Sequence, residues 1–248
     1  MKINIVKNIE ELSFVAARKM IEKVRNQPTT VLGLATGSTP LGTYQKLVQD
    51  YHENKTSYKH VTTFNLDEYV GLDGNDRNSY RHYMKENLFD HININDHHTF
   101  LPNGLAIDLQ GECQRYEKKI VASGGIDLQI LGLGVNGHIG FNEPGTPFAS
   151  RTHVVSLAES TRQANSRYFK TLEDVPTKAI TMGIETIMSA REVLLLVSGK
   201  KKAKVLREVI EGTVNEDVPA TALKNHPNIT IIADEASVQS LTKQCQMK

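Results

Sequence analysis

The chain has 248 residues and a mass of 27.6 kDa, a length that suits one large α/β domain. Its 29 Lys and Arg side chains balance 28 Asp and Glu, so no overall charge indicates nucleic acid or a membrane surface as partner. Cys113 and Cys245 lie far apart without a CxxC or Cys/His spacing, which argues against a disulfide framework or a zinc site. Because the N-terminal residues lack a signal-peptide pattern and no stretch approaches a membrane span, we expect a cytoplasmic protein.

Strand-like and helix-like segments alternate along the chain. Lys2 to Val6 reads as a strand, and Asn8 with Glu11 three residues later predicts a helix start with a reciprocal cap. The apolar face of that helix comprises Ile9, Leu12, Ala16, Met20 and Val24. Further buried strands are predicted at Thr30 to Ala35, Val61 to Asn65, Ile126 to Leu133, Glu192 to Val197 and Ile229 to Ala233. Further helices are predicted at Leu41 to Tyr51, Asp108 to Ser123, Lys200 to Glu211 and Ala236 to Cys245.

This alternation predicts a largely parallel sheet with helices on both faces, in a single domain over residues 1–248. The stretch from Gly140 to Arg151 is rich in loop-forming residues, and we expect an active-site flap near residues 140–170. Ligands of open α/β sheets bind beyond the carboxyl ends of the strands. Three motifs stand at such positions.

The first motif, GLATGSTP, begins at Gly33 and leads from an apolar strand into a small, hydroxyl-rich turn. Such a turn exposes backbone N–H groups at a helix N-terminus, and Gly37 lets an anion approach them closely. The alternative is a plain tight turn with Ser38 or Thr39 as N-cap and Pro40 at the first helical position. No Lys follows the last Gly, so the motif favours a monophosphate over ATP.

The second motif, FNLDEY, places two carboxylates, Asp67 and Glu68, after the end of an apolar strand. A carboxylate there is suited to act as a general base. The alternative is that Asp67 caps the following turn while Glu68 is solvated.

The third motif, GLGVNGHIGFNEP, follows the strand that ends near Leu131. Its first three glycines satisfy GxGxxG, but the glycines and prolines that follow interrupt the helix that a dinucleotide fold needs. His138 and Glu143 are instead suited to proton transfer, because a carboxylate orients an imidazole or relays its proton. The alternative for an isolated histidine near a strand end is a structural role.

Together, TGSTP, FNLDEYVGL and GLGVNGHIGFNEPG resemble the glucosamine-6-phosphate deaminase family, and the segments SRTHVVSLAESTRQANSRYF and VSGKKKA are similar to it in the same order. The resemblance implies an open, Rossmann-like α/β sheet. It further implies the isomerisation of glucosamine 6-phosphate to fructose 6-phosphate with release of ammonia, and neither a metal nor an organic cofactor.

The resemblance also implies a role for each residue of the second and third motifs. Asp67 would be the base that moves the C2 proton of the open-chain sugar to C1, and His138 with Glu143 would open the sugar ring. Asn136 stands where many family members carry Asp. An amide can orient the imidazole by a hydrogen bond but cannot stabilise its charged form as a carboxylate does, so we expect an altered pH profile.

For the substrate phosphate, the resemblance implies binding by Ser38 and Thr39 beside Gly37, with positive charge from Arg167 and Lys202. Guanidinium, ammonium and backbone N–H groups are the expected receptors of a phosphate. From charge alone, Lys202 would be a solvated member of the run Lys200 to Lys204.

The alternatives are a galactosamine-6-phosphate isomerase, a 6-phosphogluconolactonase or a sugar-phosphate sensor without turnover. Lactone hydrolysis needs no enolisation base, so FNLDEY argues against the lactonase. Family members activated by an effector place Ser, Arg and Lys where this chain has Pro147, His153 and Val155. We therefore expect an unregulated monomer or small homo-oligomer that binds only its small-molecule substrate.

Overall fold

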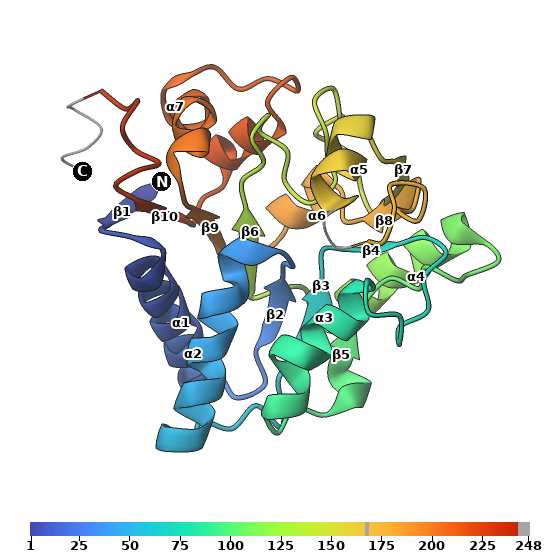
Figure 1. Ribbon diagram of the computed structural model, residues 1–248. Helices are drawn as coiled ribbons and strands as arrows, with labels where there is room; N and C mark the ends of the chain where they lie inside the picture. The colour runs from blue at the N-terminus through green and yellow to red at the C-terminus, as the bar shows by residue number, and fades with distance from the viewer. Residues whose placement is uncertain (167–168, 243–248) are drawn as a thin grey trace.

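The computed structural model describes residues 1–166 and 169–242. Its main sheet is parallel throughout, with strand order β1-β10-β9-β6-β2-β3-β5 (Figure 1). The strands are β1 (Lys2–Val6), β2 (Val31–Leu34), β3 (Thr62–Asn65), β5 (Thr99–Phe100), β6 (Leu128–Gly132), β9 (Val193–Val197) and β10 (Ile229–Asp234). Four of them, β2, β6, β9 and β10, consist mainly of fully buried apolar residues, as expected of parallel strands covered on both faces.

Helices lie on both sides of this sheet. They are α1 (Ile9–Asn26), α2 (Ser38–Asn54), α3 (Tyr80–Asn87), α4 (Leu109–Ala122), α5 (Glu159–Asn165), α6 (Ile184–Met188) and α7 (Ala203–Glu211). The crossovers through α1 and α2 run toward the β5 edge, whereas those through α4, α6 and α7 run toward the β1 edge. Since parallel crossovers are right-handed, these two sets of helices cover opposite faces. The predicted α/β fold is thereby confirmed.

A second sheet of three short antiparallel strands, ordered β4-β8-β7, was not predicted. Its strands are β4 (Asp67–Tyr69), β7 (His153–Ser156) and β8 (Lys178–Thr181). Only three or four residues form each strand, and β7 is not buried, so no continuous apolar run marks them in the sequence. The sheet matters because β4 carries the two carboxylates of the second motif.

Two details of α1 differ from the prediction. Asn8 caps the helix as expected, its Oδ1 accepting a hydrogen bond from the Glu11 backbone N–H at 3.0 Å. The Glu11 carboxylate, however, accepts from the N–H of Lys7 rather than from that of Asn8. Ile9 is 45% exposed, because it is the first helical residue and lies before the turns that pack on the sheet. Leu12, Ala16, Met20 and Val24 are buried as predicted.

The helix predicted from Ala236 to Cys245 is wrong over its described part, residues 236–242, which form turns. The backbone N–H of Ser237 donates to Asp234 Oδ1 and its hydroxyl donates to the Asp234 carbonyl, while Leu241 N–H bonds to the carbonyl of Val238. These short-range bonds replace the i to i−4 bonds of a helix. Residues 243–245 lie outside the described residues.

Strand order and crossover direction together define the position of a ligand. The chain leaves β2 toward the β5 edge and leaves β6, the neighbouring strand, toward the β1 edge. The crossover direction therefore reverses between these two strands, and ligands of open α/β sheets bind at this reversal. The first and third motifs follow β2 and β6.

Candidate active site

The residues of all three motifs, together with Lys202, follow four adjacent strands of the main sheet. Asp67 follows β3, Gly37 follows β2, His138 follows β6 and Lys202 follows β9, and the strand order is β9-β6-β2-β3. Because these strands are parallel, their carboxyl ends meet at one edge. The fold thus gathers segments that lie far apart in the sequence.

The turn after β2 presents the N-terminus of α2. Gly37 is the N-cap with a φ of 98°, which favours glycine, and α2 begins at Ser38. No side chain caps this helix and no acidic residue lies in its first turn. The alternative in which Ser38 or Thr39 is the N-cap is therefore wrong. The N-terminal dipole of α2 points outward at the edge where an anion would bind.

The two carboxylates of β4 occupy different environments. Asp67 is buried, and burial followed by the nearby charge of Glu68 raises its pKa from 3.8 to about 8. Glu68 is also buried, but its carboxylate accepts hydrogen bonds from the backbone N–H groups of Tyr69, Tyr80 and Arg81. The alternative of a turn-capping Asp67 beside a solvated Glu68 is therefore wrong. The raised pKa of Asp67 is suited to a general base.

The loop after β6 holds an imidazole beside a carboxylate. His138 Nδ1 lies 3.6 Å from Glu143 Oε2, and the other carboxylate oxygen accepts a hydrogen bond from the Thr161 hydroxyl at 2.7 Å. The nearby His138 imidazole, with the hydrogen bonds from Thr161 and Asn136, lowers the pKa of Glu143 to about 2 against the opposing effect of burial. A Cβ on Gly134 would lie 2.4 Å from atoms of the His138 ring, so the glycine makes room for the imidazole.

Asn136 acts on the carboxylate rather than on the imidazole. Its Nδ2 donates to Glu143 Oε2 at 2.6 Å, and its Oδ1 accepts from the backbone N–H of His138 at 3.3 Å. The expected hydrogen bond to the imidazole is not present. Asn136 therefore orients His138 only indirectly, through Glu143 and the loop backbone.

The histidine loop is fastened to the strand pair that carries Asp67. Thr181 of β8 pairs with Asp67 in the ladder, and its Oγ1 accepts the backbone N–H of Phe141 at 3.1 Å. The buried Asn142 amide donates to the carbonyls of Ile139 and Met182, both at 2.8 Å. A Cβ on Gly140 would lie 3.5 Å from Asp67 Oδ2. The backbone at Gly140 thus lies directly beside the Asp67 carboxylate.

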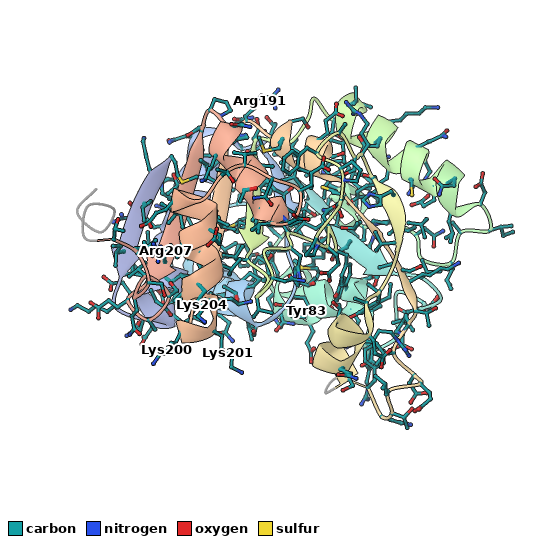
Figure 2. All side chains as sticks on the ribbon, turned by 90° about the horizontal axis from the view of Figure 1, so that it is seen from above. Tyr83, Arg191, Lys200, Lys201, Lys204 and Arg207 are labelled. Atoms are coloured by element: carbon teal, nitrogen blue, oxygen red, sulfur yellow. The ribbon has the colours of Figure 1, made fainter. Side chains whose placement is uncertain are left out.

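Lys202 differs from the other lysines of its run. Lys200, Lys201 and Lys204 are exposed near the start of α7 (Figure 2), whereas Lys202 is partly buried and burial lowers its pKa. The turn before it is fixed because the Asp234 carboxylate accepts hydrogen bonds from the Ser198 hydroxyl and the Gly199 N–H. A partly desolvated ammonium at the strand edge is suited to an anionic ligand. Arg167, the other predicted cation, lies outside the described residues.

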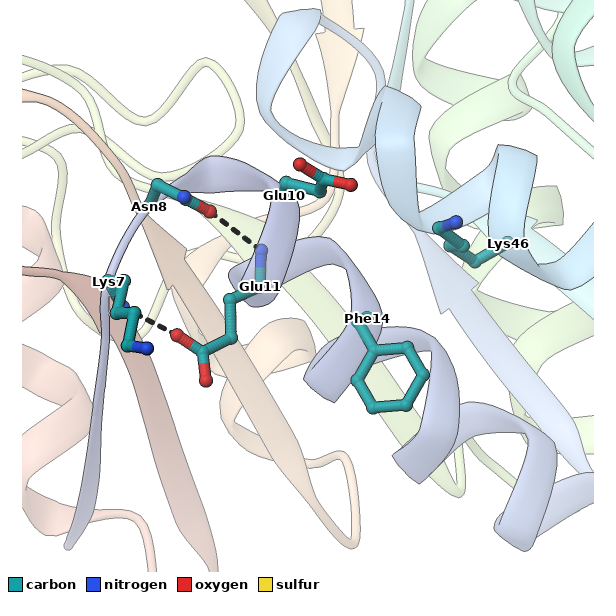
Figure 3. Close-up of a pocket in the computed structure, with 6 residues that line it drawn as sticks. All are labelled: Lys7, Asn8, Glu10, Glu11, Phe14 and Lys46. Atoms are coloured by element: carbon teal, nitrogen blue, oxygen red, sulfur yellow. Dashed lines mark hydrogen bonds between the residues drawn. The ribbon is translucent and has the colours of Figure 1, made fainter.

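A surface pocket at the start of α1 is lined by Lys7, Asn8, Glu10, Glu11, Phe14 and Lys46 (Figure 3). Its hydrogen bonds join the side chains of Asn8 and Glu11 to backbone N–H groups and are those of the helix cap. None of the predicted site residues lines it. Among residues 1–166 and 169–242, no three His, Cys, Asp or Glu side chains are grouped as metal ligands would be.

Sequence reasoning missed three side chains that complete this site. Thr161 and Thr181 support Glu143 and the histidine loop, and the Tyr83 hydroxyl donates to the Gly37 carbonyl at 2.7 Å. Hydroxyl residues at unremarkable positions carry no motif of their own. The helix that carries Tyr83 could have been predicted from Ser79, a typical N-cap residue, which caps α3 by accepting a hydrogen bond from the N–H of His82.

The sequence is similar to those of known proteins along nearly its whole length. The family model described as glucosamine-6-phosphate isomerases/6-phosphogluconolactonase matches residues 7–232. The glucosamine-6-phosphate deaminase of Shouchella clausii is 56% identical over 247 residues, covering 100% of both chains. That of Halalkalibacterium halodurans is 57% identical over 241 residues, covering 97% of this chain and 98% of its own.

Solved structures agree with these relatives. A monomeric glucosamine-6-phosphate deaminase superimposes with a TM-score of 0.95 at 50% identity, covering 97% of this chain and 100% of that one. The 6-phosphogluconolactonase of Trypanosoma brucei, at 23% identity and a TM-score of 0.78 over 97% of this chain and 98% of its own, shares the fold. The chain belongs to the glucosamine-6-phosphate isomerase/6-phosphogluconolactonase family.

Proposed function

We propose that this chain is a glucosamine-6-phosphate deaminase, which converts glucosamine 6-phosphate and water to fructose 6-phosphate and ammonia. Relatives at 56% and 57% identity over nearly the whole chain carry that name. The lactonase structures are 17% to 23% identical and support only the common fold. The assignment of individual residues to steps of the reaction rests on the geometry of the site.

Ring opening is the first step and needs a proton carrier beside the sugar. The imidazole of His138 removes the proton of the C1 hydroxyl and returns a proton to the ring oxygen as the bond between C1 and the ring oxygen breaks. Glu143, with its low pKa, stays ionised and stabilises the imidazolium that forms. Asn136 and Thr161 hold the carboxylate in place for this task.

Enolisation follows and is the task of Asp67. The carboxylate removes the C2 proton of the open-chain sugar and delivers it to C1, while O1 gains a proton and the amine loses one, which converts the amino aldose to a fructosimine. Water then adds at C2 and ammonia leaves, giving fructose 6-phosphate. A pKa of about 8 makes Asp67 a much stronger base than an ordinary carboxylate, because its burial disfavours the charge.

The phosphate is bound at the N-terminus of α2. The backbone of Gly37, Ser38 and Thr39 offers N–H groups there, and Lys202 with Arg167 supplies positive charge. Support comes from the uncapped helix start and from the partial burial that distinguishes Lys202 from the neighbouring lysines. Charge-assisted hydrogen bonds of this kind recognise phosphates strongly.

One observation carries the choice of a deaminase over a lactonase. Asp67 is buried beside the backbone of the histidine loop, with a raised pKa. Lactone hydrolysis needs no base to remove a carbon-bound proton, so the lactonase reading leaves this carboxyl without a task. Galactosamine 6-phosphate differs from glucosamine 6-phosphate only in the configuration at C4, so an assay with each sugar distinguishes these two substrates.

The test is to incubate the purified protein with glucosamine 6-phosphate and to measure ammonia and fructose 6-phosphate together. We expect equal amounts of both, in the presence of a chelator and without added nicotinamide. Parallel incubations with galactosamine 6-phosphate and 6-phosphogluconolactone should give slower turnover or none. Faster hydrolysis of the lactone, or sugar binding without any product, would overturn the proposal.

We further propose that the protein is a cytoplasmic monomer. A monomeric deaminase is among its closely similar structures, at 50% identity. Within residues 1–166 and 169–242, the structure has no helix with both the length and the apolar composition needed to cross a membrane. Gel filtration with light scattering distinguishes a 27.6 kDa particle from a larger assembly.

A further inference from the structure

The peptide group between Gly37 and Ser38 joins a glycine turn to the first residue of α2. Gly37 adopts a φ of 98°, and glycine populates positive and negative φ about equally. No side chain caps the helix that starts at Ser38. As the carbonyl of an N-cap residue, the Gly37 C=O is placed to accept the first backbone hydrogen bond of α2, and a contact from elsewhere in the fold reinforces that orientation.

That contact comes from Tyr83. Its hydroxyl, in the first half of α3, donates a hydrogen bond of 2.7 Å to the carbonyl of Gly37 (the side chain is labelled in Figure 2). A peptide group is planar and trans, so its C=O and N–H bonds point in opposite directions. Holding the Gly37 carbonyl against α3 directs the Ser38 N–H away from α3.

The helix that carries Tyr83 is itself anchored to the strand of the base. Glu68 accepts the N–H groups of Tyr80 and Arg81 with its two carboxylate oxygens, each at 2.9 Å. Glu68 follows Asp67 directly in β4. The Tyr83 hydroxyl is thus held at a fixed position relative to the base, and the Gly37 carbonyl is held relative to the hydroxyl.

We infer that Tyr83 is a positioning residue for phosphate recognition: it orients the Gly37–Ser38 peptide so that the Ser38 N–H points to the substrate phosphate. This inference rests on the proposed function. The phosphate is attached at C6 whereas the base acts at C2, so the distance between the turn and Asp67 decides whether a bound sugar is correctly placed. The pairing of β2 with β3 sets that distance, and Tyr83 orients the N–H group at the phosphate end of the site.

The test uses Tyr83→Phe, which removes the hydroxyl and keeps the ring. Calorimetric titration with inorganic phosphate should give an affinity about 2- to 12-fold below that of the wild type, the loss of one hydrogen bond. The KM for glucosamine 6-phosphate should rise by a similar factor, while kcat and its pH profile stay unchanged. Tyr58→Phe is the matched control, because the buried Tyr58 hydroxyl has no hydrogen-bond partner among the described residues.

Each outcome is decisive. Phosphate affinity unchanged by Tyr83→Phe, in a wild type that binds phosphate competitively with the sugar, would overturn the inference and leave the phosphate turn in place. A wild type that does not bind phosphate in competition with the sugar would overturn both the inference about Tyr83 and the proposed phosphate site at the start of α2. A fall in kcat with unchanged KM and phosphate affinity would also contradict a positioning role. Thermal unfolding of both variants identifies any loss of phosphate affinity that comes from a destabilised fold. An equal loss of phosphate affinity in Tyr58→Phe would count against the inference.

Discussion

Asp67 and Glu68 are neighbours in β4, yet their carboxylates are stabilised very differently. Glu68 accepts three backbone N–H groups, whereas the raised pKa of Asp67 reflects burial and the charge of Glu68, which no hydrogen bond from a described residue offsets. One buried carboxylate therefore anchors α3, and the other is the base of the proposed mechanism. The charge of Glu68 adds to burial in raising the pKa of Asp67.

The first prediction concerns pH. Asp67 must be ionised to accept a proton, so kcat/KM should rise with pH and level off above about 8. A profile already flat between pH 6 and 9 would contradict a base with this pKa. Measuring kcat/KM over that range, with Asp67→Glu for comparison, decides the point.

Protein stability should depend on pH for the same reason. The folded pKa of Asp67 is raised above its unfolded value of 3.8, so the folded state holds a proton that the unfolded state has released. The stability from this group is fully present below pH 3.8 and is lost as pH rises through about 8. Asp67→Asn should be less sensitive to pH in this range, as denaturant unfolding at pH 6 and pH 9 would show.

Asn136→Asp would place a second negative charge at the carboxylate of the relay. The amide donor to Glu143 Oε2 would be lost and replaced by a like charge, which raises the pKa of Glu143 from about 2. We expect an active variant whose log kcat/KM falls with a slope near two, rather than one, at low pH. Superimposable profiles for variant and wild type would show that Asn136 does not influence the relay.

Lys202→Ala should weaken phosphate recognition by about 1.5 to 3 kcal/mol, or roughly 10- to 150-fold in affinity, the contribution of one charge-assisted hydrogen bond. Lys201→Ala is the matched control, because Lys201 is the exposed neighbour in the same 3-10 turn. Competition by inorganic phosphate measures the affinity. Equal effects of the two variants would assign Lys202 to the solvated surface. Arg167→Ala should behave as Lys202→Ala.

Kinetics should be hyperbolic, with a Hill coefficient near one. Of the three positions compared with regulated family members, Val155 is apolar and packs beside the cluster of Tyr69 and Phe141, while His153 Nδ1 contacts the backbone carbonyl of Arg151. Neither offers a permanent positive charge to an effector. Sigmoidal kinetics that become hyperbolic with N-acetylglucosamine 6-phosphate would contradict this prediction.

The main sheet was predictable because its strands are apolar runs with helical segments between them, and burial on both faces requires such runs. The second sheet was not predictable, because β4 coincides with the second motif and its polar sequence Asp67-Glu68 gives no strand pattern. The helix α3 was not predicted, for a related reason. Its residues are mostly polar, and only Met84 of the helix is buried.

The candidate site was likewise only partly predictable from the sequence. Motifs indicated Asp67, His138 and Glu143, since carboxylates and an imidazole near glycines suggest chemistry by themselves. Which of two adjacent carboxylates is the base depends on the hydrogen bonds to Glu68 from α3, a helix that begins twelve residues after it. Contacts of this kind arise only from the three-dimensional packing.

The measurement that tests the central claim is hydrogen exchange at C2 in deuterated water, with wild type and Asp67→Asn. The wild type should give fructose 6-phosphate that carries deuterium at C1, because the proton held by Asp67 exchanges with solvent before delivery. Asp67→Asn keeps the shape but not the base, so turnover and C2 exchange should fall roughly 10²- to 10⁴-fold while inorganic phosphate still binds. An Asp67→Asn variant that exchanges the C2 proton at the wild-type rate would show that another group is the base.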